Sequence, residues 1–83
     1  MKRLERITMN PKVMGGKPCI RGMRVTVGMI LESLSAGMTH EELLFNFPYL
    51  EEADISEALA YGAQLAQGYE VDLSINPAIL IQS

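Results

Sequence analysis

The sequence is poor in the residues from which catalytic and metal sites are most often built. It has one cysteine, Cys19, and one histidine, His40. A single thiol excludes an internal disulfide framework and a cysteine-rich zinc site. No set of His, Asp and Glu residues has the spacing of metal ligands, and Gly15-Gly16-Lys17 lacks the Gly-Lys-Ser/Thr ending of a phosphate-binding Walker loop. The sequence therefore indicates a protein that is not an enzyme and has no cofactor.

Long apolar segments are also missing. No run approaches the ~20 residues that span a bilayer, and the start of the chain lacks the apolar core of a signal peptide. The composition, with 83 residues of which 48% are apolar and 20% charged, is that of one small globular domain. We therefore expect a single cytoplasmic domain without membrane contact. Because a chain of this size buries only about 60% of its unfolded surface, we expect a homodimer.

Positive charge is absent from most of the chain. After Arg24 the sequence has nine acidic residues and no lysine or arginine, whereas all seven basic residues precede that point with a single acid, Glu5. Such asymmetry indicates a charged partner for the basic segment, or contact between this segment and the acidic face of another subunit. If the partner is DNA, the phosphate contacts are expected from Arg3, Arg6, Lys12, Lys17, Arg21 and Arg24.

The first part of the chain, residues 1–25, is predicted to be a basic arm of strands and loops. Residues 7–9 have the β-branched alternation of a short strand, which the Asn-Pro pair at 10–11 stops. The Arg-Gly pair at 21–22 indicates a tight reversal between two short extended segments. These strands are too short to be stable without other partners.

From Thr26 onward the apolar residues follow the period of a helix. Thr26 is a suitable N-cap for the first helix, and Gly37 stands where a left-handed C-terminal residue is wanted. Thr39 and Glu42 have the spacing of a capping box at the start of the second helix. Pro48 ends this second helix, whose apolar face is formed by Leu43, Leu44 and Phe47.

A third helix is predicted from Glu51 or Asp54 to Gln67, with Gly68 ending it. Its apolar positions, among them Leu59, are expected to face inward. The outward face then carries four polar or aromatic residues: Asp54, Glu57, Tyr61 and Gln64.

The apolar tail, residues 69–83, alternates apolar and polar residues up to position 75, which is typical of a half-buried strand. Such a tail must be covered, either by the domain itself or by a partner. The residues expected to contact a protein partner are Val71, Leu73, Ile75, Ile79 and Ile81.

The three helices of residues 26–68, the second and third joined by a short turn, resemble a helix-turn-helix unit. The predicted fold is therefore mainly α, a three-helix, homeodomain-like bundle with short N-terminal β-strands. The third helix begins with acidic residues, which repel phosphates. DNA binding consequently requires the basic arm, with Tyr61 and Gln64 left to contact the bases.

Several segments resemble the prokaryotic family catalogued as domain of unknown function 433. They are the extended motif at 15–27 and the segments at 34–39, 47–50 and 58–61, within a similarity that runs from 7 to 66. The resemblance implies the predicted fold and the activity of an antitoxin, which binds and silences a PIN-like ribonuclease toxin and represses its own promoter. Two positions depart from the family pattern: Glu51 replaces a Ser or Thr cap, and Gly62 replaces alanine.

Two functional hypotheses follow. The first is an antitoxin-type regulator that binds double-stranded DNA and a toxin. The alternative is a homo-oligomeric protein-interaction module without DNA binding, in which the basic arm of one subunit neutralises the acidic helices of another.

Overall fold

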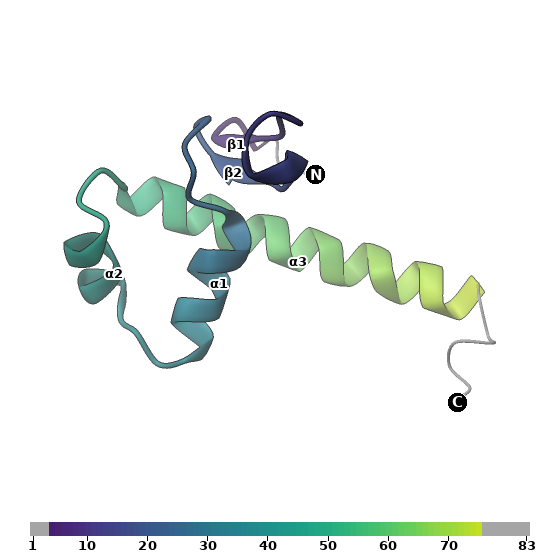
Figure 1. Ribbon diagram of the computed structural model, residues 1–83. Coiled ribbons are helices and arrows are strands. Elements are labelled where there is room, and N and C mark those ends of the chain that lie inside the picture. The colour runs from purple at the N-terminus through teal and green to yellow at the C-terminus, as the bar shows by residue number, and fades with distance from the viewer. Residues whose placement is uncertain (1–3, 76–83) are drawn as a thin grey trace.

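The computed structural model describes residues 4–75, and the surroundings of side chains for residues 4–68. The described chain is mainly α, with three helices and one two-stranded antiparallel sheet, as predicted (Figure 1). None of the helices in this range has the length and apolarity that a bilayer crossing requires. In chain order the elements are β1 (Ile7–Thr8), the 3₁₀ turn η1 (Met14–Gly16), β2 (Cys19–Ile20), α1 (Val27–Ser35), α2 (His40–Asn46) and α3 (Glu52–Ile75).

The sheet is small and ends in a tight turn. β1 pairs with β2 so that Ile7 lies opposite Ile20. The predicted reversal follows at once: Arg21 and Gly22 both have positive φ, 47° and 74°, and the Met23 N–H donates to the Ile20 carbonyl at 2.8 Å. Two successive left-handed residues match the right-handed twist of a hairpin, and arginine is an uncommon residue in this conformation.

The starts of α1 and α2 are set by the predicted caps. The Thr26 hydroxyl accepts from the Met29 N–H at 3.0 Å. The Thr39 hydroxyl accepts from the Glu42 N–H at 3.0 Å, and the Glu42 carboxylate accepts from the Thr39 N–H at 2.9 Å. Gly37, with φ of 101°, follows α1 in the left-handed conformation. These predictions are therefore confirmed. Each depends on residues only a few positions apart, which is why the sequence alone was sufficient to make it.

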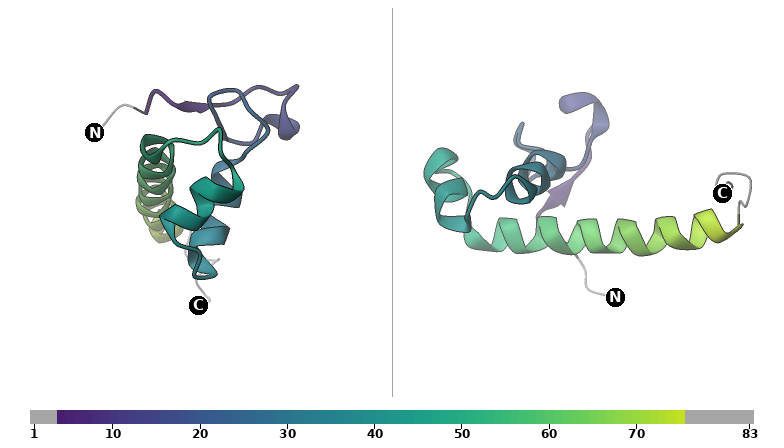
Figure 2. Two further views of the ribbon diagram at one scale, coloured as in Figure 1. Left: turned by 90° about the vertical axis from the view of Figure 1, so that its left-hand side faces the viewer. Right: turned by 90° about the horizontal axis from the view of Figure 1, so that it is seen from below.

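The third helix is longer than predicted. It passes through Gly68 and ends at Ile75, so the prediction that Gly68 ends the helix and that residues 69–75 form a strand is wrong. A strand needs a neighbouring strand, whereas an existing helix gains one hydrogen bond per added residue without a new nucleation step. A glycine costs such a helix only about 1 kcal/mol. Figures 1 and 2 show the second half of α3 extending away from the rest of the molecule.

The core lies between the sheet and the three helices. Ile20 of β2, Ile30 of α1, Leu43 of α2 and Ile55 of α3 are fully buried, and Val25 is nearly so. The basic segment therefore contributes side chains to the core, in addition to carrying charge. Its removal is expected to expose the apolar faces of α1 and α3.

The orientation of α3 differs from the prediction. Asp54, expected to face outward, has an exposed fraction of 0%, whereas Leu59, expected to face inward, is 43% exposed. Tyr61 is half-buried and packs against the core. The buried face thus includes Asp54, Ile55 and Ala58, because a carboxylate can occupy an inward position when cations pair with it.

Candidate functional site

The most elaborate polar site in the described chain is built around the buried carboxylate of Asp54. We call the four residues that form it the Asp54 cluster: Arg6, Arg21, Glu51 and Asp54. The Arg21 guanidinium donates through Nε to Oδ1 at 3.1 Å and through Nη2 to Oδ2 at 2.8 Å. Arg6 Nη1 donates to Asp54 Oδ1 at 2.9 Å and to Glu51 Oε1 at 2.7 Å. The backbone N–H of Glu51 donates to Asp54 Oδ2 at 2.8 Å.

The cluster joins segments that are far apart in the sequence. Beyond the ion pairs, the backbone N–H of Arg6 donates to Glu57 Oε1 at 2.8 Å. Arg21 Nη2 also donates to the carbonyl of Tyr49 at 2.9 Å. The segment before β1, the turn after β2, and the turn that leads into α3 are thereby held together. This connection accounts for the left-handed conformation of Arg21, since the same residue forms the turn and the ion pair.

Electrostatics in the cluster favour the ionised carboxylate. Burial of the Asp54 carboxyl acts to raise its pKa, but hydrogen bonds from Arg21, from the Glu51 backbone and from Arg6 outweigh burial and lower the pKa from 3.8 to about 2. The pKa of Arg6 is raised chiefly by its hydrogen bond to Glu51, and that of Arg21 by its hydrogen bond to Asp54. Arg6, Arg21 and Asp54 are therefore charged at neutral pH.

The predicted DNA contacts fall into two groups. Arg6 and Arg21 are engaged with Asp54, whereas Lys12, Lys17 and Arg24 are exposed and form no ion pair with the residues that the structure describes. Arg3 lies outside the described residues. Within residues 4–68, fewer basic side chains are therefore available to bind phosphates than the sequence alone suggests.

The two residues expected to contact bases are less accessible than predicted. Tyr61 and Gln64 are both half-buried. The first turn of α3 carries the acidic residues Glu52 and Asp54, and acidic groups oppose the approach of phosphates. This end of α3 is therefore poorly suited to bind DNA without help from the basic segment.

Three of the five residues predicted to contact a protein partner lie at the other end of α3. Val71, Leu73 and Ile75 belong to the part of the helix that extends from the globule (Figure 1). Ile79 and Ile81 lie outside the described residues.

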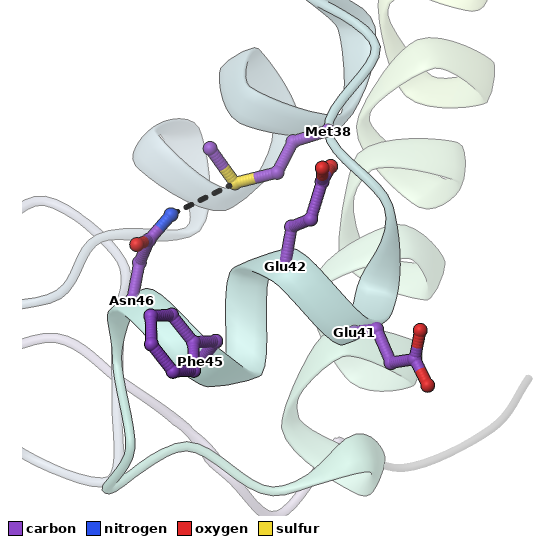
Figure 3. Close-up of a pocket in the computed structure, with 5 residues that line it drawn as sticks. All are labelled: Met38, Glu41, Glu42, Phe45 and Asn46. Carbon is purple, nitrogen blue, oxygen red and sulfur yellow. Dashed lines mark hydrogen bonds between the residues drawn. The ribbon is translucent and has the colours of Figure 1, made fainter.

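A surface feature that the sequence analysis missed lies on α2. Phe45 is 84% exposed and borders an open hollow of about 540 Å³ with Met38, Glu41, Glu42 and Asn46. Figure 3 shows the Phe45 ring projecting from α2 beside Asn46, with the carboxylates of Glu41 and Glu42 toward the start of the helix. The sequence pattern could have indicated this exposure, because Phe45 lies outside the apolar face formed by Leu43, Leu44 and Phe47.

A second hollow of about 450 Å³ lies between the start of α1 and the middle of α3. Its apolar lining includes Met29 and Leu31 from α1, and Tyr61 and Leu65 from α3. We call this hollow the α1–α3 groove; Lys17 and Glu32 also line it and supply one charge of each sign.

Metal binding has no visible basis in the described residues. Between residues 4 and 75, no three or more His, Cys, Asp or Glu side chains come together in a way that could hold an ion. Cys19 is buried, with Sγ 3.3 Å from the Lys17 carbonyl.

Comparison with known proteins assigns the chain to a family. The model of the family described as protein of unknown function (DUF433) matches residues 7–62, and the chain therefore belongs to this family. The crystal structure of a DUF433 member from Anabaena variabilis is similar, with 30% sequence identity and a TM-score of 0.71 over 83% of this chain and 68% of the other. No curated protein matches the chain. The family membership indicated by the sequence is thereby confirmed, over residues 7–62.

Proposed function

We propose that the protein is an antitoxin-type regulator that acts mainly by binding a partner protein, a PIN-like ribonuclease toxin, and that it also binds its own promoter. In this proposal the protein has no catalytic role. The globule formed by the sheet and the packed helices is the stable base, and the extended half of α3 is the contact for the toxin.

The observation that carries the toxin proposal is the length of α3. The helix continues to Ile75, far beyond Tyr61, which packs against the core. The sequence of this distal half includes the apolar residues Val71, Leu73 and Ile75. An amphipathic or apolar helix that extends from a domain is stabilised when a partner groove covers it.

Substitution of Leu73 by aspartate is expected to abolish stable binding of the toxin, because a charge is then placed in an apolar contact. The measurement is co-purification of this chain with the toxin encoded beside it, followed by assay of the toxin's ribonuclease activity. We expect binding to weaken by at least about tenfold, since burial of one leucine contributes roughly 2 kcal/mol.

Ser74→Asp is the matched control, because it adds the same charge at the next position of the same helix. The proposal requires this variant to bind and inhibit the toxin like the native chain. Equal affinity of the L73D and S74D variants for the toxin would refute a contact through the distal half of α3.

The DNA part of the proposal is supported by the three exposed cations Lys12, Lys17 and Arg24. A dimer that uses them on both subunits neutralises about six phosphates, so the logarithm of affinity should fall with the logarithm of salt with a slope near −5. Fluorescence anisotropy with the duplex upstream of the coding region measures this slope. Alanine at all three positions should remove most of the binding while the thermal transition stays unchanged.

The alternative is an interaction module without DNA binding. Within one chain Arg6 and Arg21 already pair with Glu51 and Asp54 at the start of α3. These two arginines are therefore less available to phosphates, and they are equally less available to the acidic helices of another subunit. If no binding to the duplex is found at low salt although the oligomer is intact, this alternative replaces the DNA part of the proposal.

A further inference from the structure

Phe45 is an aromatic side chain whose exposure is not explained by the fold. At 84% exposure it contributes little to the core, whereas α2 is held in place by the fully buried Leu43. Large aromatic residues at the centre of a protein interface commonly supply much of the binding energy. The α2 surface therefore has the character of an anchor for another molecule (Figure 3).

The α1–α3 groove offers an apolar surface that such an aromatic side chain could contact. Met29 and Leu65 on its walls are 37% and 44% exposed, which leaves apolar area open to solvent. Its volume of about 450 Å³ is enough to admit a phenyl ring. Because Phe45 is exposed in the same chain, the groove is not occupied by its own Phe45.

The charges around the two surfaces also match. Glu41 and Glu42 precede Phe45 on α2 and line the same hollow, and Lys17 lies at the groove. Among the described residues, none of these three side chains forms an ion pair. Glu32, which also lines the groove, repels Glu41 and Glu42. Electrostatic attraction therefore adds little to the affinity and mainly orients the contact.

We infer that two copies of this chain associate by inserting Phe45 of each copy into the α1–α3 groove of the other. A two-fold arrangement forms this contact twice, since each chain carries both surfaces. This association is a property of the isolated protein and requires neither toxin nor DNA. A second copy is the expected occupant of the groove, because one chain supplies the aromatic anchor, the apolar groove and charges of both signs.

Two single variants and their mixture test the inference. Phe45→Ala removes the anchor and leaves the groove intact, whereas Leu65→Glu places a charge in the groove and leaves the anchor intact. By sedimentation velocity of the full chain, we expect a dimer for the native protein. Each variant alone should dissociate with a Kd at least about tenfold higher, given the area that a phenylalanine buries.

The mixture is the decisive sample. In a heterodimer of the two variants, Phe45 of the L65E chain faces the intact groove of the F45A chain, so one of the two contacts is retained. An equimolar mixture should therefore form a heterodimer at concentrations where each variant alone is a monomer. Leu59→Glu is the matched control, because Leu59 is 43% exposed on the same helix and does not line the groove. The L59E variant should dimerise like the native chain.

Several results would overturn the inference. A monomeric native protein, a dimer that survives Phe45→Ala, or a mixture that fails to associate would each do so. Loss of the dimer in the L59E variant but not in the L65E variant would place the interface on the other face of α3. An F45A variant that dimerises normally but no longer binds the toxin would assign the α2 surface to that partner instead. Circular dichroism of each variant checks that the fold is retained.

Discussion

Replacing Asp54 by alanine is expected to lower the free energy of unfolding by about 3 kcal/mol. The carboxylate is fully buried. Its removal leaves Arg6 and Arg21 without their shared acceptor, and it leaves the Glu51 N–H without an acceptor. This expected loss is at the low end of the range for a broken buried ion pair. The side chains of Arg6 and Arg21 are 32% and 36% exposed, so solvent partly screens their charges. Urea denaturation followed by circular dichroism measures the change.

Glu52→Ala is the matched control for this substitution. It removes the same charge from the first turn of the same helix, but the Glu52 side chain is 59% exposed. Among residues 4–75 its ion-pair partner is His40, at the surface. Its effect should stay below about 1 kcal/mol. Similar losses in the D54A and E52A variants would mean that the buried cluster contributes no more than an ordinary surface acid.

The same contact predicts how stability depends on pH. Because the pKa of Asp54 is lowered from 3.8 to about 2 in the folded chain, its contribution is complete above about pH 4 and is lost as the pH falls toward 2. The native protein should lose about 1 to 2 kcal/mol through this group over that range, after allowance for screening. The difference in stability between the native and D54A proteins should shrink correspondingly.

The second large effect is expected at Ile20. This residue of β2 is fully buried, and Ile20→Ala should cost about 3 kcal/mol through lost burial and the cavity that remains. A small domain with a limited core can be unfolded by a loss of this size. Thermal and urea unfolding measure the effect.

Met9→Ala provides the comparison for Ile20→Ala. Met9 lies in the same basic segment but is 60% exposed, so its replacement should change stability by less than about 0.5 kcal/mol. If Ile20→Ala were as mild as Met9→Ala, the segment would be a dispensable arm, contrary to its burial in the core.

These stability effects bear on how function is tested. Arg21→Ala removes a ligand of Asp54 as well as a positive charge, so weaker DNA binding by that variant has two causes. Arg24 forms no ion pair with the described residues and is the better probe of phosphate contact. Deleting the basic segment to test DNA binding would remove Ile20 and Val25 from the core.

The distal half of α3 illustrates where a local pattern misleads. The alternation of apolar and polar residues after Gly68 favours a strand when it is considered alone. Whether a strand forms depends on a neighbour that can pair with it, and that information is not local. In the structure the residues instead extend a helix that is already nucleated.

The features that depend on neighbouring residues can be derived from the sequence alone: the caps at Thr26 and Thr39, the left-handed Gly37, the turn at residues 21–22, and the family. The buried face of α3 and the availability of each arginine depend instead on how the chain folds. Arg6 and Arg21 lie 48 and 33 positions from Asp54. Ion pairs over such separations form only after the chain has folded, because packing brings the charges together and excludes the water that screens them.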